Sequence, residues 1–318
     1  MSQRNRRSRK SKMPFFGLLL LGAGVVLLLR NGFSTQAESQ VTPLPATPLP
    51  VTQVSLTAEA TPKFAFQTPP ANALSPFLSL MPIDAAQIDD TGLLVLVNNE
   101  HPTPSDSAPD KLACAYRVVP VRIADMYLHT TALTALDALF DAAVAAGFDN
   151  LVFSSGYRDA AEQKQIYDDA VDKRFVQPPG YSEHQTGLAA DVFALGVTEA
   201  AMPRSAEGQW LAANAVRFGF ILRYPEGKED ITGIAYEPWH FRYIGAPHAA
   251  FCTEQGLTYE EYITWLQEGG GYQMEAEGKT YTVLYEPADS GIINVPGPNI
   301  PFSISGDNAG GYIITAWE

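Results

Sequence analysis

An uncharged, mostly apolar run near the start of the chain, residues 13–29, constrains this 318-residue sequence more than any other feature. Six cations stand before the run within residues 1–12, and Arg30 follows it. A run of this length is at the short edge of what spans a bilayer and is longer than most signal-peptide cores. The positive charge before it indicates that residues 1–12 stay in the cytoplasm. The sequence therefore predicts one N-terminal transmembrane helix within residues 1–30.

We interpret this segment as an uncleaved signal anchor, with a cleaved signal peptide as the alternative. Thr35-Gln36-Ala37 is only a weak small-x-small cleavage site. The anchor predicts a single-pass protein of the cell membrane whose folded part is extracytoplasmic. Cleavage predicts a secreted protein instead.

The rest of the chain is acidic. The net charge is -14, and residues 1–30 hold seven cations and no acid, so the other residues carry -21. Nucleic-acid binding needs a basic face, so no nucleic-acid partner is expected. The 2 cysteines exclude a disulfide-dense scaffold. An extracytoplasmic location permits a Cys114–Cys252 disulfide, and the sequence leaves that pairing open.

Three further segments follow the predicted anchor. Residues 31–87 are predicted to form a Pro/Thr-rich linker, because the near-repeat in residues 41–50 has no spaced apolar face and its prolines favour extended polyproline II. Residues 88–268 mix short strands with capped helices, which indicates an α+β domain. Residues 272–318 hold strand-like runs divided by Pro and Gly, which predict a small β module of unknown role.

The predicted elements of the α+β domain follow local signals. Helices are expected over 131–146, from Asp159 to about 171, from Ser205 to 218, and from Thr258 to 269. Strands are expected at residues 93–97, 151–153, 189–193, 220–222 and 240–243.

Two short stretches hold the densest polar chemistry of the chain, SEHQTGLAAD at 182–191 and EPWH at 237–240. They offer His184, Asp191 and His240 as ligands, and Gly187 is expected to supply the bend that lets them converge. Three such ligands leave a fourth tetrahedral position open, as a catalytic zinc needs to hold a water. Glu237 is suited to take the proton of that water. Taken singly, the residues are better explained without a metal, His184 and His240 as ordinary surface or packed histidines and Asp191 as a capping residue.

In combination, these motifs resemble the D-alanyl-D-alanine carboxypeptidases of the VanY type, which are zinc peptidases acting on bacterial cell-wall stem peptides. The resemblance lies within residues 88–268. It rests on three motifs: Ser155-Gly156-Tyr157-Arg158 with Gln163, Ser182-x-His184-x-x-Gly187-x-Ala189-x-Asp191, and Glu237-x-Trp239-His240-x-Arg242-Tyr243.

The resemblance implies a role for each residue. The Zn2+ ligands would be His184, Asp191 and His240. Glu237 would be the general base that activates the zinc-bound water, and Arg158 would stabilise the oxyanion. Gln163 and Ser182 would contact the substrate, whereas the partner of Arg242 is left open. The implied fold is an antiparallel sheet with flanking helices that carries the zinc site.

The implied activity is zinc-dependent D,D-carboxypeptidase, which removes the terminal D-Ala from peptidoglycan stem pentapeptides. An L,D-carboxypeptidase that trims tetrapeptides is the alternative, since the motifs define the metal geometry and not the pocket for the penultimate residue. A non-catalytic wall-binding protein is the third hypothesis. We expect a monomer. No Ser-x-x-Lys occurs in the chain, which excludes the lysine-activated serine mechanism.

The remaining histidines, His101, His129 and His248, are not expected to bind the metal. His101 lies among prolines in a predicted loop, and His129 precedes a predicted helix. His248 follows Pro247 and is expected on the surface.

Overall fold

The structure of the chain, a computed structural model, describes residues 66–67, 80–88, 92–105, 108–269, 271–276 and 278–318. The predicted signal anchor in residues 1–30 and most of the predicted linker lie outside the described residues. Among the residues that the structure describes, no helix combines the length and the apolar character needed to cross a membrane.

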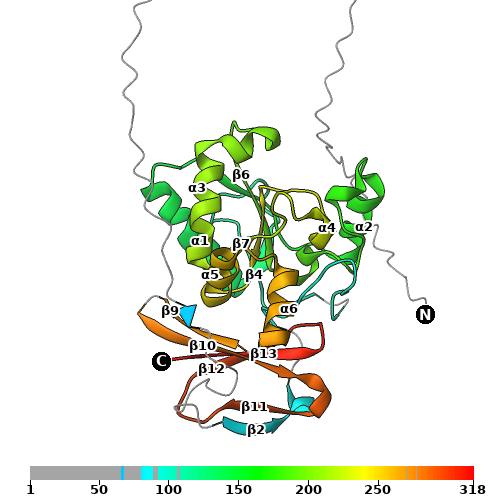
Figure 1. The fold of residues 1–318 in the computed structure, drawn as a ribbon. Helices are drawn as coiled ribbons and strands as arrows, with labels where there is room; N and C mark the ends of the chain where they lie inside the picture. The colour runs from blue at the N-terminus through cyan, green and yellow to red at the C-terminus, as the bar shows by residue number, and fades with distance from the viewer. Residues whose placement is uncertain (1–65, 68–79, 89–91, 106–107, 270, 277) are drawn as a thin grey trace, which may run out of the picture. The chain divides into compact units, whose positions relative to one another are not determined.

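A four-stranded antiparallel sheet of order β5-β6-β8-β7 runs through residues 88–268, and helices surround it (Figure 1). Its strands are β5 (Leu151–Ser155), β6 (Ala189–Ala194), β7 (Phe220–Leu222) and β8 (His240–Tyr243). The α-helices are α1 (Thr130–Ala145), α2 (Ala160–Asp169), α3 (Ala206–Asn214), α4 (Glu229–Thr232), α5 (Ala246–Gln255) and α6 (Tyr259–Gly269). A separate pair joins β3 (Leu112–Cys114) to β4 (Tyr127–His129). The predicted antiparallel sheet with flanking helices is confirmed.

Short 3-10 turns lie between the helices and strands of the described residues. They are η2 (Ala85–Gln87), η3 (Lys173–Phe175), η4 (Glu183–Thr186), η5 (Glu199–Arg204), η6 (Ala215–Phe218) and η7 (Ala288–Ser290).

The longer helices begin where the capping residues predict. The Asp159 carboxylate accepts from the Glu162 amide at 2.7 Å to start α2. Thr258 and Glu261 bond to each other's amides at 2.8 and 3.2 Å to start α6, which is a complete capping box.

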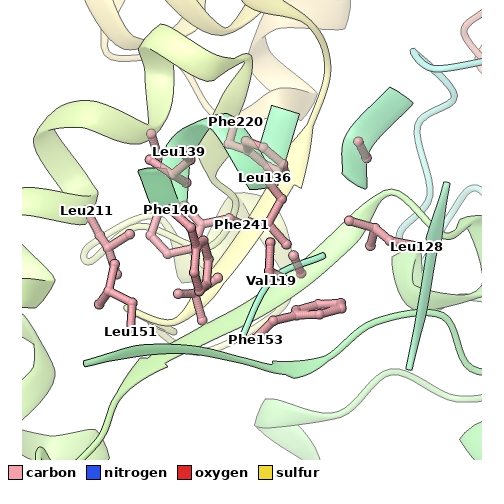
Figure 2. Packing of buried hydrophobic residues seen from close by; sticks show 14 of the residues in the cluster. Val119, Leu128, Leu136, Leu139, Phe140, Leu151, Phe153, Leu211, Phe220 and Phe241 are labelled. Carbon is pink, nitrogen blue, oxygen red and sulfur yellow. The ribbon is translucent and has the colours of Figure 1, made fainter. Parts of the chain in front are cut away.

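The main hydrophobic core lies between α1 and the four-stranded sheet (Figure 2). Leu136, Leu139 and Phe140 recur at helical spacing on one face of α1, and all three are buried. They pack in one cluster with Phe220 of β7 and Phe241 of β8. Each such side chain contributes about 1.5–3 kcal/mol when fully buried. This packing fixes the strands that carry the polar motifs.

Two elements differ from the sequence prediction. Residues 93–97 were expected to form a strand, but they have no strand structure, although residues 94–97 are buried. The carbonyls of Leu93 and Val95 instead accept from Arg242 Nη2 at 3.0 and 2.9 Å. Helix α5 was not predicted. Its signals were present nonetheless, since Pro247 lies in its first turn and Gly256 ends it.

The predicted β module is present and extends beyond residues 272–318. Its five-stranded sheet has the order β1-β9-β10-β13-β12, and β11 pairs with β2 in a separate two-stranded sheet. The strands are β1 (Phe66–Gln67), β2 (Leu80–Asp84), β9 (Gly271–Ala276), β10 (Lys279–Pro287), β11 (Ile292–Pro296), β12 (Phe302–Gly306) and β13 (Gly311–Trp317). We use "β module" for these seven strands.

The linker prediction is corrected at its C-terminal end. Part of residues 31–87 belongs to the β module, because β2 pairs antiparallel with β11 and β1 pairs with β9. Both strands add to edges whose backbone groups would otherwise lack partners. The sequence conceals β2, since this short segment contains Pro82, a residue that strands accept mainly at edges.

The β module shares a core with α5 and α6. Phe251 of α5, Tyr262 of α6 and Tyr272 of β9 are buried together, and the Phe251 and Tyr272 ring centroids lie 4.1 Å apart. Aromatic pairs of this kind contribute about 0.5–1.5 kcal/mol beyond their buried area. The module is therefore packed against the preceding helices.

The two cysteines do not pair. Cys114 is exposed on β3, Cys252 is buried in α5, and both are free thiols. The disulfide that an extracytoplasmic location permits does not form in this fold.

The expected surface position of His248 is wrong. The side chain is buried in α5, where Nδ1 lies 2.6 Å from the Tyr262 hydroxyl and Nε2 lies 3.0 Å from Thr315 Oγ1. Two hydroxyl partners satisfy a neutral ring without any opposing charge. Burial lowers the pKa of His248 to about 3.

We expect His248→Gln to reduce the loss of unfolding free energy that acid pH causes. The folded ring stays neutral while the unfolded ring takes a proton below about pH 6.5, so the wild type loses up to about 1.4 kcal/mol per pH unit as the pH falls from there toward 3. The variant lacks this pH-dependent loss of stability, because it has no ring at position 248 to protonate. Urea unfolding at pH 7, 5.5 and 4.5 would measure it: the stability advantage of the wild type should shrink with falling pH, and a constant difference would contradict the expectation.

Candidate metal centre

His184 lies on a short turn that leads into β6. The turn η4 begins after Ser182 and ends at Gly187, whose φ is 68°. A side chain at position 187 would also meet Leu112 Cδ2 at 2.7 Å, but the left-handed backbone conformation is what requires glycine here. The bend returns the chain toward the strand that carries Asp191, as the motif spacing predicts.

Strand pairing places Asp191 beside His240. Asp191 of β6 is directly opposite His240 of β8 in the antiparallel register. Side chains paired in this way have Cβ atoms about 4.5–5.5 Å apart. Ser155 of β5 faces Asp191 from the other neighbouring strand, next to a register shift. The sheet thus holds the Asp191 carboxylate, which belongs to the second motif, between strands that carry the first and third motifs.

The three predicted ligands converge on one point. Asp191 Oδ1 lies 3.6 Å from His184 Nε2 and 3.2 Å from His240 Nδ1. One ligand atom from each residue lies within 4.8 Å of the others. Asp191 Oδ1 is buried, yet it has no hydrogen-bond partner among the described residues. A buried carboxylate oxygen left between two imidazole nitrogens fits a bound cation, and the donor set suits Zn2+.

Hydrogen bonding sets the tautomer of the His184 ring. Nδ1 lies 2.7 Å from the Gly156 carbonyl oxygen, and since a carbonyl only accepts, Nδ1 donates and Nε2 keeps its lone pair. Burial, with the nearby Arg158 charge, lowers the pKa of His184 to about 4. The ring is therefore neutral at pH 7, the state in which an imidazole binds a metal.

The His240 ring lies between carboxylates. Nδ1 faces Asp191, and Nε2 lies 3.4 Å from Glu183 Oε2. Burial alone would lower the pKa of His240, but the adjacent carboxylates of Asp191, Glu183 and Glu237 raise it to about 9. Carboxylates that favour a proton here also favour a metal cation in its place.

Glu237 lies at the edge of this group. Its Oε2 is 3.5 Å from His240 Nδ1, and the side chain is buried. Burial raises the pKa of Glu237 to about 8. A carboxyl group whose pKa is near the working pH can both take and return a proton.

Arg158 reaches the site from the segment after β5. Its Nη2 lies 3.6 Å from Asp191 Oδ2, while Nε donates to Ser155 Oγ at 3.2 Å and Nη1 donates to Gln163 Oε1 at 2.9 Å. Gln163 is buried, and its amide nitrogen donates to the Gln177 carbonyl at 2.6 Å. Gln163 thus holds Arg158 in place, and its expected substrate contact stays a prediction.

Ser182 and Trp239 occupy different surroundings. Ser182 is buried at the start of η4, where its side chain makes no capping hydrogen bond, so its expected substrate contact also stays a prediction. The Trp239 ring stacks between Phe175 and Phe193, with centroids 6.5 and 5.5 Å away. Trp239 is therefore a packing residue, held between two aromatic rings.

Sequence reasoning missed a buried ion cluster next to this site. Glu183, between two motif residues, accepts from Arg223 Nε at 2.7 Å and from Arg242 Nη1 at 2.9 Å. Burial alone would raise the pKa of Glu183, but the two guanidinium groups hold it well below its ordinary value. A signal was available, because Arg223 and Arg242 follow or interrupt apolar strand residues, where a charge requires a partner.

Gly156→Ala is expected to destabilise the protein and to displace His184. A Cβ at position 156 would lie 2.3 Å from the Tyr127 carbonyl oxygen, and the Gly156 carbonyl is the partner of His184 Nδ1. Overpacking of this kind costs about 1–3 kcal/mol. Urea unfolding would measure the loss against Gly269→Ala, whose Cβ would meet only Trp265 at 3.7 Å. Equal losses in the two variants would contradict this account.

Comparisons with known proteins match the region that contains the site. The family described as VanY, D-alanyl-D-alanine carboxypeptidase, matches residues 125–246. A D-alanyl-D-alanine carboxypeptidase of Enterococcus faecium is 36% identical over 236 residues, which cover 71% of this chain and 75% of that protein.

Two solved structures resemble the fold. The vancomycin-resistance D,D-dipeptidase VanXYg, solved with a D-Ala-D-Ala phosphinate analogue, has a TM-score of 0.65 at 30% identity and covers 76% of this chain and 99% of its own. The LdcB LD-carboxypeptidase has a TM-score of 0.50 at 38% identity and covers 54% of this chain and 86% of its own. With the motif residues gathered in one site and the Enterococcus faecium protein matched over three quarters of its length, this chain belongs to the VanY family of D-alanyl-D-alanine carboxypeptidases.

Proposed function

We propose that residues 88–268 form a zinc-dependent D,D-carboxypeptidase that removes the terminal D-Ala from peptidoglycan stem pentapeptides. The observation that carries the proposal is the convergence of His184, Asp191 and His240, with Glu237 Oε2 3.5 Å from His240 Nδ1. Three protein ligands are the number that catalytic zinc sites use, because a fourth position must admit water or substrate.

When bound, Zn2+ would supply Lewis-acid chemistry at the scissile carbonyl and make water a stronger nucleophile. Glu237 takes the proton of the attacking water and returns it to the leaving amine of D-Ala. Burial raises the pKa of this carboxyl to about 8, and a cation held by the neighbouring ligands would lower it. Glu237 thus acts first as a base and then as an acid.

Arg158 stabilises the negative charge that develops on the carbonyl oxygen. Ser155 and Gln163 hold the guanidinium in place through Nε and Nη1. A fixed donor aimed at such an oxyanion contributes about 3 kcal/mol to catalysis. Gln163 therefore acts through Arg158, while the Ser182 hydroxyl, which does not cap its turn, is proposed to contact the substrate.

An L,D-carboxypeptidase that trims tetrapeptides is the second candidate. It is favoured by the 38% identity with the LdcB LD-carboxypeptidase over 54% of this chain. The ligands, base and oxyanion donor serve both reactions equally, because none of these groups selects the stereochemistry of the penultimate residue.

The test is to incubate the purified full-length protein with a pentapeptide ending in D-Ala-D-Ala and with the matching tetrapeptide, and to identify the products by mass. We expect loss of one D-Ala from the pentapeptide, abolished by a chelator and restored by Zn2+. Cleavage of the tetrapeptide alone would establish the L,D activity instead. No cleavage of either peptide, with one equivalent of Zn2+ bound, would overturn both and favour first a different peptide substrate and then a non-catalytic wall-binding protein.

We further propose that residues 1–30 anchor the enzyme in the cell membrane, that its catalytic domain is extracytoplasmic, and that it acts as a monomer. The support is the block of six cations directly before the apolar run. In untreated cells the protein should sediment with the membranes. Protease added to intact cells should digest its catalytic domain. Recovery of the protein from the medium would indicate a cleaved signal peptide. Light scattering of the detergent-solubilised protein would measure its oligomeric state.

A further inference from the structure

The fully buried Glu183 side chain has a different partner for each of its two oxygens. Oε1 accepts from Arg223 Nε at 2.7 Å and from Arg242 Nη1 at 2.9 Å. Oε2 lies 3.4 Å from His240 Nε2, on the opposite edge of the ring from the nitrogen that faces Asp191. The arginines therefore fix one carboxylate oxygen and leave the other directed at the ring.

Arg242 is itself held by three backbone groups. Its Nη2 donates to the carbonyls of Leu93 and Val95, and its Nε donates to the carbonyl of Tyr243 at 3.0 Å. Its guanidinium lies over the Tyr259 ring, 5.3 Å from the centroid. With its donors used in this way, Arg242 cannot follow a movement of Glu183.

Arg223 joins the cluster to α6. Its Nη1 donates to Glu260 Oε2 at 2.8 Å, and its Nη2 donates to Oε1 of the same carboxylate. Two guanidinium groups thus face two carboxylates, Glu183 and Glu260, so the cluster is balanced in charge. A buried ion cluster seldom stabilises a fold more than apolar side chains of the same size would. Its position against His240 suggests a different role.

We propose that Glu183 is a positioning residue for the metal ligand His240, an inference that rests on the zinc site proposed above. The Glu183 carboxylate accepts the Nε2 proton of His240, which keeps the lone pair on Nδ1 and orients it toward the site of the metal. Carboxylates behind a metal-binding imidazole fix its tautomer and orientation, and their loss lowers metal affinity about 10–100-fold. Arg223 and Arg242 keep the carboxylate ionised and immobile.

Glu260 offers a matched control within the same cluster. It pairs with the same Arg223 but makes no contact with His240. Glu260 also lines a cleft of about 380 Å³ and its side chain is partly exposed, so the neutral Gln side chain can hydrogen-bond to water there. A change at Glu260 therefore disturbs the ion cluster while the contact between Glu183 and His240 remains.

The experiment compares Zn2+ affinity in the full-length wild type, Glu183→Gln, Glu260→Gln and Glu183→Asp, by competition with a chromophoric chelator. Circular dichroism checks that each variant is folded. Glu183→Asp keeps the charge that the arginines need and withdraws the oxygen from His240, so it decides the question if Glu183→Gln does not fold. As a second readout, proton NMR of the zinc-loaded protein follows the hydrogen-bonded Nε2–H signal of His240.

We expect Glu183→Gln and Glu183→Asp to bind Zn2+ about 10–100-fold more weakly and to shift the Nε2–H signal. Glu260→Gln should retain an affinity and a signal close to those of the wild type. Wild-type affinity in a folded Glu183 variant, or equal losses in the Glu183 and Glu260 variants, would overturn the inference and leave the zinc site intact. Failure of the wild type to bind Zn2+ would overturn the proposed function as well.

Discussion

Replacing Glu237 by glutamine is expected to lower kcat for D-Ala release about 10³-fold, within the 10²–10⁴-fold range of general acid–base groups. The amide keeps the size of the side chain but cannot accept the proton of the attacking water. Zn2+ should stay bound at one equivalent, because Glu237 is not among the three converging ligands. Steady-state kinetics with a D-Ala-D-Ala pentapeptide, together with metal analysis, would measure both effects.

The control for this variant is Glu226→Gln. Glu226 is exposed on the surface before α4, and its replacement should leave kcat and the metal content unchanged. A Glu237→Gln protein that retains most of its kcat with Zn2+ bound would contradict the assigned role. A protein that loses kcat only because it has lost Zn2+ would make Glu237 a residue of the metal site instead.

Asp191→Asn is expected to lower Zn2+ affinity by more than about 100-fold, the upper end of what outer-shell substitutions cost, and to abolish turnover at trace zinc. The substitution removes the charge between His184 Nε2 and His240 Nδ1 and offers a weaker amide oxygen in its place. It also removes the partner of Arg158 Nη2. Competition with a chelator would measure the affinity, and D-Ala release with and without added Zn2+ would measure the activity.

Asp149→Asn is the matched control, since Asp149 is exposed in the connection between α1 and β5. It should bind Zn2+ as the wild type does. If Asp191→Asn also bound Zn2+ with wild-type affinity, the metal would have to lie elsewhere in the protein.

The sequence was sufficient where the cause of a structure is local. Asp159 with Glu162 and Thr258 with Glu261 mark two helix starts, because a capping side chain bonds an amide only two or three residues away. The members of the converging group His184, Asp191 and His240 were likewise predictable from the motif spacing. Their convergence follows from the bend at Gly187 and the pairing of β6 with β8.

The parts that could not be predicted depend on contacts between distant segments. Glu183 meets Arg223 and Arg242 across separations of 40 and 59 residues, and no local pattern specifies those pairs. Strand β2 pairs with β11, although the whole of residues 88–268 separates the two strands in the sequence. His248 is buried because the β module covers α5, so the apolar neighbours that would reveal it lie in other elements.

The most direct test of the central claim is to locate the metal by X-ray diffraction from the zinc-loaded protein, recorded on both sides of the zinc absorption edge. The account predicts one anomalous peak within about 2.0–2.2 Å of His184 Nε2, an Asp191 carboxylate oxygen and His240 Nδ1, with Glu237 outside bonding distance. A peak bound through His240 Nε2, or one at a different group of residues, would contradict it.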